Sequence, residues 1–209
     1  MASWLTGLGL GVSVAAPIGP VNVATIQLGL ARGFGPACAF GLGAATIDAA
    51  YCFAVYFGVA PLLVAAPWLR VVLYASGAML LGRIAWSALR RRVDLAGGPE
   101  RGSASVWRSY AAGVALTAVN PATILSWLAI GGAALASIPS GDGPLLVSGI
   151  FAGSACWFAA LSIGASAGRR IADERAMRIV SIVCGLALFA FAAVFAWNGA
   201  REALTFIGA

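Results

Sequence analysis

The stretch Pro17-Ile18-Gly19-Pro20-Val21-Asn22 interrupts an apolar segment, residues 5–30, that contains no charged residue. An uncharged segment of this length can cross a bilayer as a helix, which requires about 20 apolar residues. Two prolines and a glycine near its middle disfavour a continuous helix, because proline in a helix interior costs roughly 3 kcal/mol or more. Within hydrocarbon, broken backbone is tolerated where protein or a water-filled cavity covers it. The stretch therefore predicts a transmembrane helix broken beside a polar cavity, with a simple packing kink as the alternative.

The composition indicates a polytopic membrane protein. Of the 209 residues, 61% are hydrophobic and 10% are charged, and the mean hydropathy is +0.95, more apolar surface than a soluble domain of this size can bury. The chain has no histidine, which disfavours a His-based metal site, and its four cysteines form no C-x-x-C pair. The longest polar stretch, residues 90–108, is too short for a soluble catalytic domain, and we predict neither enzymatic activity nor a cofactor. The net charge of +6 comes from arginines that lie mostly in short loops, so we do not expect nucleic-acid binding.

Charged residues divide the chain into six expected spans. They cover approximately residues 3–30, 34–59, 68–89, 109–136, 144–168 and 177–197. A polar linker, residues 93–108, separates a first repeat, residues 1–92, from a second, residues 109–209. Because each half has an odd number of spans, the second half enters from the opposite face, as in many secondary transporters. The predicted fold is all-α, with six transmembrane helices forming two inverted three-helix repeats whose first helices are discontinuous.

The arginines predict the orientation. Eleven of the 13 lie in or near the first, third and fifth loops, and only Arg70 and Arg201 lie toward the other side. Basic residues concentrate in cytoplasmic loops. We therefore expect these three loops in the cytoplasm and both termini outside it, in the periplasm.

A second break is expected where the second repeat opens. The segment Thr117-Ala118-Val119-Asn120-Pro121-Ala122-Thr123 places an Asn-Pro pair between hydroxyl residues inside an apolar run. Half-helix N-termini at such breaks have free N–H groups that suit a carboxylate, and freed carbonyls suit an ammonium or a cation.

Asp48 is the strongest single candidate for a functional residue. It lies about 20 Å into its expected helix, at 1.5 Å per residue, and an acid inside a membrane costs about 3 kcal/mol on insertion scales. Such a carboxylate can exchange a proton or bind a cationic group of a substrate. The alternative is a structural ion pair with Arg83, whose side chain can instead reach the cytoplasmic interface.

Polar side chains near the breaks complete the expected substrate and proton pathway. Donors for a carboxylate, carbonyls for an amine and a nearby acid would complement a zwitterion. The predicted pathway residues are Gly19, Pro20, Asn22, Thr46, Asp48, Asn120, Pro121 and Thr123. Small-residue pairs such as Gly149 and Gly153 are expected to pack helices closely.

These motifs resemble a known family. The run Pro17 to Asn22, followed by Gly29-Leu30-Ala31-Arg32-Gly33 and Asp48, and later Val119-Asn120-Pro121, is similar to the LysE/RhtB family of bacterial amino-acid exporters. The resemblance implies an inner-membrane secondary transporter that exports amino acids or related metabolites, driven by the proton motive force. It also implies that the Gly-Pro and Asn-Pro pairs, Asn22 and Asp48 belong to the functional core. Val21 stands where lysine exporters usually have a polar residue, which weighs against lysine or arginine as the substrate.

Two other classes of function stay open from the sequence. One is an exporter of a metal or other inorganic ion from the same superfamily, and the other is a membrane scaffold without transport activity. The missing histidine argues against the first, and the breaks with a buried acid argue against the second. A homodimer is compatible with the small-residue faces but is not required by them.

Overall fold

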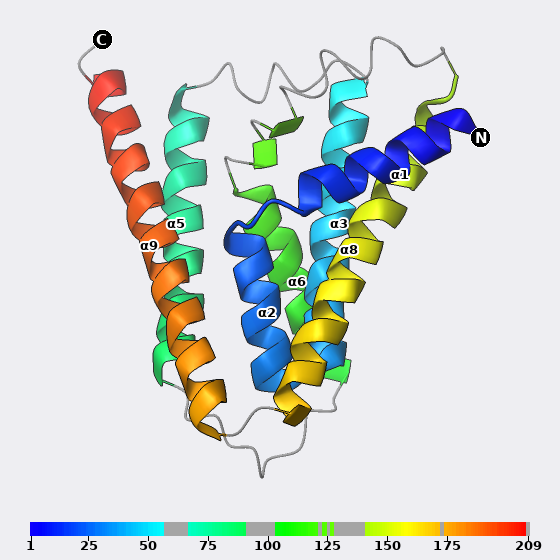
Figure 1. Ribbon diagram of the computed structural model, residues 1–209. Coiled ribbons are helices and arrows are strands. Elements are labelled where there is room, and N and C mark those ends of the chain that lie inside the picture. The colour runs from blue at the N-terminus through cyan, green and yellow to red at the C-terminus, as the bar shows by residue number, and fades with distance from the viewer. Residues whose placement is uncertain are drawn as a thin grey trace.

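The protein is built from helices. The structure, a computed structural model, describes residues 1–56, 67–90, 103–120, 123–124, 126–127, 141–171 and 174–207. The helices, labelled as in Figure 1, are α1 (Ala2–Ala15), α2 (Pro20–Arg32), α3 (Phe34–Tyr56), α5 (Pro67–Arg90), α6 (Ser103–Ala118), α8 (Gly143–Ile171) and α9 (Glu174–Ile207). Both termini lie toward the upper end of this view, and α2 passes into α3 at the lower end (Figure 1).

Several helices have the length and composition of membrane spans. Phe34–Tyr56, Gly143–Arg169 and Arg178–Leu204 are each long and apolar enough, and α5 carries a shorter apolar stretch, Val71–Trp86. Helices α1 and α2 meet the same criterion together, but they are bent by 80° at their junction. The predicted interruption of the first segment is therefore confirmed, while the number of six spans stays a prediction.

Helix boundaries extend beyond the apolar runs. Helix α6 begins at Ser103, inside the segment expected to be the linker, and α9 continues past Trp197 to Ile207. Arginine and glutamate are good helix formers, and their side chains can reach the membrane surface while the backbone stays helical. Span boundaries predicted from charged residues alone are therefore shorter than the helices.

Close packing of backbones joins α1 to α8. A Cβ atom added at Gly7 or Gly11 would collide with the carbonyl oxygens of Leu146 and Ile150, respectively. Reciprocally, Cβ atoms at Gly149 and Gly153 would collide with carbonyls of α1. The packing role predicted for Gly149 and Gly153 is confirmed, and the order of these contacts makes the two helices run in the same direction.

The same kind of contact joins α3 to α6. A Cβ atom at Gly43 would collide with the Tyr110 carbonyl, and one at Gly113 would collide with the Phe40 carbonyl. Bonds from Thr46 to Tyr110 and from Tyr51 to Ala118 follow the pair along its length. These two helices are therefore also parallel.

Helices α5 and α9 form a third, antiparallel pair. Gly77 lies against the Phe195 ring, Gly199 lies against Tyr74, and the rings of Tyr74 and Phe195 meet edge to face at 5.9 Å. This pair contacts the remaining described helices chiefly along α2. Figure 1 shows α5 and α9 side by side on the left, with α2 between them and the other helices.

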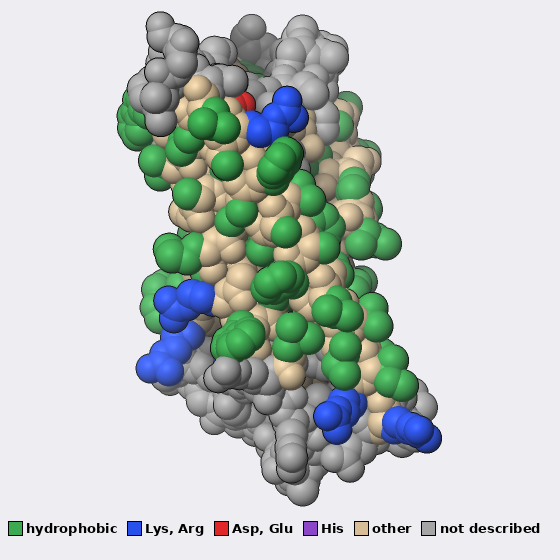
Figure 2. Space-filling model, turned by 90° about the vertical axis from the view of Figure 1, so that its left-hand side faces the viewer, with side chains coloured by type: hydrophobic (Ala, Val, Ile, Leu, Met, Phe, Trp, Pro, Cys, Tyr) green, Lys and Arg blue, Asp and Glu red, His purple; other side chains and the backbone are tan. Residues whose placement is uncertain are grey.

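The outer face of the α5–α9 pair is apolar. Val183, Leu186, Phe189, Val194 and Trp197 of α9 are each more than half exposed. In Figure 2, hydrophobic side chains are spread over the middle of this face, and most of the arginine side chains lie toward its lower end. Exposed apolar surface of this extent is typical of a membrane-embedded protein.

Candidate functional site: a chamber at two helix breaks

The chamber is a cavity of about 260 Å³ beside the α1–α2 junction. Its lining comes from the first break, from α3, from α6 and the segment after it, and from α8 and α9. It is close in size to the smaller ligand pockets of proteins, which begin near 300 Å³. The lining residues are Val14, Ala15, Pro17, Ile18, Gly19, Pro20, Val21, Asn22, Asp48, Thr117, Asn120, Thr123, Ser126, Phe158, Phe191 and Phe195.

The first break is an orderly restart of the helix. Gly19 is the N-cap residue of α2 in an extended conformation, with φ −136° and ψ −174°, and Pro20 occupies the first turn. Proline fits there because the first-turn N–H has no partner within the helix. The Gly19 carbonyl accepts the first helical hydrogen bond from Val23 at 3.1 Å. No side chain caps this helix start, and Gly19 and Pro20 line the chamber, so the positive end of α2 borders it.

Asn22 closes the gap that the break leaves in the backbone. Its Nδ2 donates to the carbonyl oxygens of Ala15 at 2.8 Å and Pro17 at 2.7 Å, and its Oδ1 accepts from Trp157 Nε1 at 3.0 Å. Carbonyls without partners are costly in an apolar interior. Two of the carbonyls expected to be open to a substrate amine are therefore already paired with Asn22.

Asp48 extends from α3 into the chamber wall and is only 4% exposed. Its Oδ1 accepts from Trp127 Nε1 at 3.3 Å. The Ser154 hydroxyl lies beside the carboxylate and donates to the Gly11 carbonyl, 3.2 Å away. Within the described part of the chain Asp48 forms no ion pair, and the Arg83 side chain is exposed and does not line the chamber.

At the second break the chain is helical again at residues 123–124 and 126–127. Helix α6 ends at Ala118, and its last carbonyl accepts from the Tyr51 hydroxyl at 2.6 Å. The Asn120 carbonyl then accepts from Ile124 N at 3.2 Å, so Asn120 occupies the position that Gly19 has at the first break. In the sequence each of these residues is followed by a proline.

The structure brings most of the predicted pathway residues together. Gly19, Pro20, Asn22, Asp48, Asn120 and Thr123 all line the chamber. Thr46 does not, because its hydroxyl bonds to the Leu42 carbonyl at 2.9 Å and to Tyr110 at 3.0 Å, facing α6. Pro121 lies outside the described residues.

The sequence interpretation missed the two tryptophans. The indole N–H groups of Trp127 and Trp157 donate to Asp48 and Asn22, respectively. A buried indole N–H usually finds an acceptor, and this rule identifies the interior acid and amide as candidate partners. Thr117 is also notable, because its hydroxyl is buried in the chamber wall without a hydrogen-bond partner in the described structure.

A helical membrane protein with a polar chamber between two interrupted helices has the architecture of a membrane transporter. Comparison with known proteins agrees: the LysE type translocator family matches residues 12–199, so the chain belongs to this family. The translocators are transport proteins, as the resemblance of the motifs predicted.

The relatives cover almost the whole chain. It is 34% identical over 209 residues to YcgF of Bacillus subtilis (strain 168), for which its name proposes amino acid efflux, with 98% of this chain and all of the relative aligned. It is 27% identical to the arginine exporter protein ArgO of Serratia proteamaculans (strain 568), over 96% of this chain and 98% of the relative. ArgO of Escherichia coli O157:H7 is 26% identical over 96% of each chain. No solved structure matches the chain.

Proposed function

We propose that the protein exports amino acids or related small metabolites across the bacterial inner membrane, driven by the proton motive force. The observation that carries the proposal is the convergence of two helix starts and one buried acid, Asp48, on a single chamber. The family and the names of its relatives support amino-acid export as the transported class.

The chamber suits a zwitterion. The positive end of α2 favours a carboxylate. Among the described lining residues Asp48 supplies the one acid for an ammonium group. The unpartnered Thr117 hydroxyl offers a further hydrogen bond. Phe158, Phe191 and Phe195 add an apolar wall, against which an uncharged side chain of the substrate can pack.

Proton coupling in this proposal also depends on Asp48. A carboxylate buried at this depth is costly as an isolated charge, so it is stable either protonated or paired with the ammonium of the substrate. Proton uptake can therefore release the substrate, and substrate binding can release the proton. This exchange is the chemistry of an antiporter.

The packing of the helices supports an inverted repeat. Helix α1 runs parallel to α8, and α6 runs parallel to α3, each pair joined by glycines at backbone contact. If the two halves of the chain are exchanged, α1 takes the place of α6 and α3 takes the place of α8, so one parallel pair becomes the other. A two-fold axis in the membrane plane requires this relation. The termini are then on the same side, which we propose to be the periplasm.

Efflux from proteoliposomes tests the function. The vesicles are loaded with one labelled amino acid at a time, and a pH gradient is imposed. We expect efflux of at least one amino acid to depend on the gradient, and Asp48→Asn to reduce it about a hundredfold because a charge-assisted contact is lost. The matched control is Glu202→Gln, which neutralises a carboxylate that does not line the chamber.

Three outcomes would contradict parts of the proposal. Equal efflux by wild type and Asp48→Asn would remove Asp48 from the mechanism. A folded protein that releases no amino acid at all would favour an inorganic-ion exporter or a scaffold. An N-terminal tag located in the cytoplasm would overturn the proposed orientation.

A further inference from the structure

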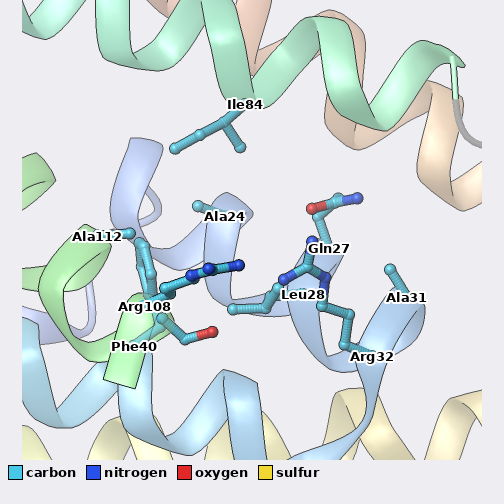
Figure 3. A pocket seen from close by; sticks show the side chains of 10 residues that line it. Ala24, Gln27, Leu28, Ala31, Arg32, Phe40, Ile84, Arg108 and Ala112 are labelled. Atoms are coloured by element: carbon cyan, nitrogen blue, oxygen red, sulfur yellow. The ribbon is translucent and has the colours of Figure 1, made fainter. Parts of the chain in front are cut away.

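A second cavity, which we call the vestibule, lies on α2 beyond the chamber (Figure 3). Its volume is about 190 Å³, and α2, α3, α5 and α6 contribute to its walls. Asn22 of the chamber and Gln27 of the vestibule are separated by five residues, or about 7.5 Å of helix. The lining residues are Ala24, Gln27, Leu28, Ala31, Arg32, Phe40, Ile84, Arg108, Ser109 and Ala112.

Two arginines from different helices face each other across the vestibule. Arg32 comes from the last turn of α2 and Arg108 from α6. In Figure 3 their guanidinium groups point toward one another. No acidic residue is among the described lining residues. Arg32 and Arg108 therefore present two guanidinium groups to the same cavity.

Gln27 adds a neutral donor at the same place. Its side chain is 6% exposed, it lines the vestibule, and in Figure 3 its amide lies beside the Arg32 guanidinium. Among the described residues it makes no hydrogen bond. The amide lines the cavity, so its N–H groups can donate to a ligand that accepts a hydrogen bond.

The chemistry of these groups indicates which anion they bind. Guanidinium groups form paired, planar hydrogen bonds with carboxylates and phosphates. The vestibule lies at the arginine-rich end of the helices, which the charge distribution predicts to be cytoplasmic. An exported amino acid arrives from that side and carries a carboxylate.

We propose that the vestibule is a first binding site for the substrate α-carboxylate, held by Arg32, Arg108 and Gln27 before the substrate moves to the chamber. This inference rests on the proposed export of amino acids. It also has a consequence for specificity. Two fixed positive charges disfavour a side chain that is itself cationic, so neutral amino acids are expected to bind here more tightly than arginine.

Chemical modification of arginine tests the vestibule without transport. The protein in phosphatidylcholine nanodiscs is treated with phenylglyoxal, and the labelling of each arginine is followed by mass spectrometry. L-alanine at near-saturating concentration is expected to slow labelling of Arg32 and Arg108 about fivefold and to leave the exposed Arg83 unchanged. L-alaninol, which has the ammonium but no carboxylate, is expected to give no protection.

Further arms of this experiment separate the alternatives. The same protection in Asp48→Asn would show that the vestibule binds independently of the chamber. No protection by L-alanine or by any other neutral amino acid, or equal protection by L-alaninol, would overturn the inference. Protection that requires phosphatidylglycerol and not an amino acid would overturn it in favour of a lipid phosphate.

Transport kinetics provide the second test. Arg32→Gln and Arg108→Gln are each expected to raise KM for efflux about tenfold with little change in kcat. Arg108→Lys keeps the charge and guards against a folding defect, and Arg83→Gln removes an arginine from the same region outside the vestibule. An unchanged KM in a protein that still exports would refute the vestibule alone, whereas arginine protection without any efflux would refute only the proposed export.

Discussion

At both helix breaks a residue that precedes a proline accepts a hydrogen bond from the amide four residues later. The two breaks are supported by side chains in different ways. At the first, Asn22 belongs to the helix that restarts, and its side chain reaches back to the carbonyls of Ala15 and Pro17. At the second, the support comes from another helix, because Tyr51 of α3 binds the Ala118 carbonyl. The side chain that spans the first break therefore comes from its own chain segment, whereas the Tyr51 contact at the second break comes from α3, the helix that also carries Asp48.

Among the substitutions that test this comparison, Asn22→Ala is expected to cause the largest loss of stability. Asn22→Ala leaves two carbonyls and the Trp157 N–H without their partners, which costs at least about 3 kcal/mol at 1–3 kcal/mol for each buried group. The thermal unfolding temperature of the purified protein should fall sharply. A variant as stable as wild type would show that the first break does not need its own side-chain support.

Substitution of Gly11 is expected to have the next largest effect, because α1 must stay against α8 for the first break to form. Gly11→Ala places a methyl group in the Ile150 backbone and should destabilise the protein by about 2 kcal/mol. Gly9→Ala is the matched control, since a Cβ there meets nothing within 4 Å. Equal unfolding temperatures for the two variants would contradict the close contact.

Tyr51→Phe is expected to have the smallest effect. It removes one hydroxyl from the second break, and a hydrogen bond within a membrane protein contributes about 1 kcal/mol. The measurement is the unfolding temperature together with efflux of the exported amino acid. Tyr74→Phe is the control, because the described role of Tyr74 is a ring contact with Phe195. A loss of stability as large as that of Asn22→Ala would remove the difference between the breaks.

The sequence predicts the positions of the breaks well because proline and glycine act locally. Pro20 cannot donate a backbone hydrogen bond wherever the rest of the chain lies, and the helix does restart there. Asp48 is identifiable for a similar reason, since an acid within an apolar run needs a polar environment.

Side-chain partners could not be predicted in this way. The roles of Trp127 and Trp157 depend on which helices face each other, and the spacing of residues along the chain does not contain that information. Thr46 is an example of a predicted pathway residue that does not reach the chamber. It lies on the same helix as Asp48, yet it faces α6 and bonds to Tyr110. Both cases were decided by tertiary packing.

The separateness of the α5–α9 pair has a mechanical consequence. Phe191 and Phe195 of α9 form part of the chamber wall, and Ile84 of α5 forms part of the vestibule wall, so both cavities border the joint between this pair and the rest of the helices. Few contacts other than those along α2 hold that joint. A tilt of the pair relative to the other helices would therefore change the shape of both cavities, with little repacking elsewhere.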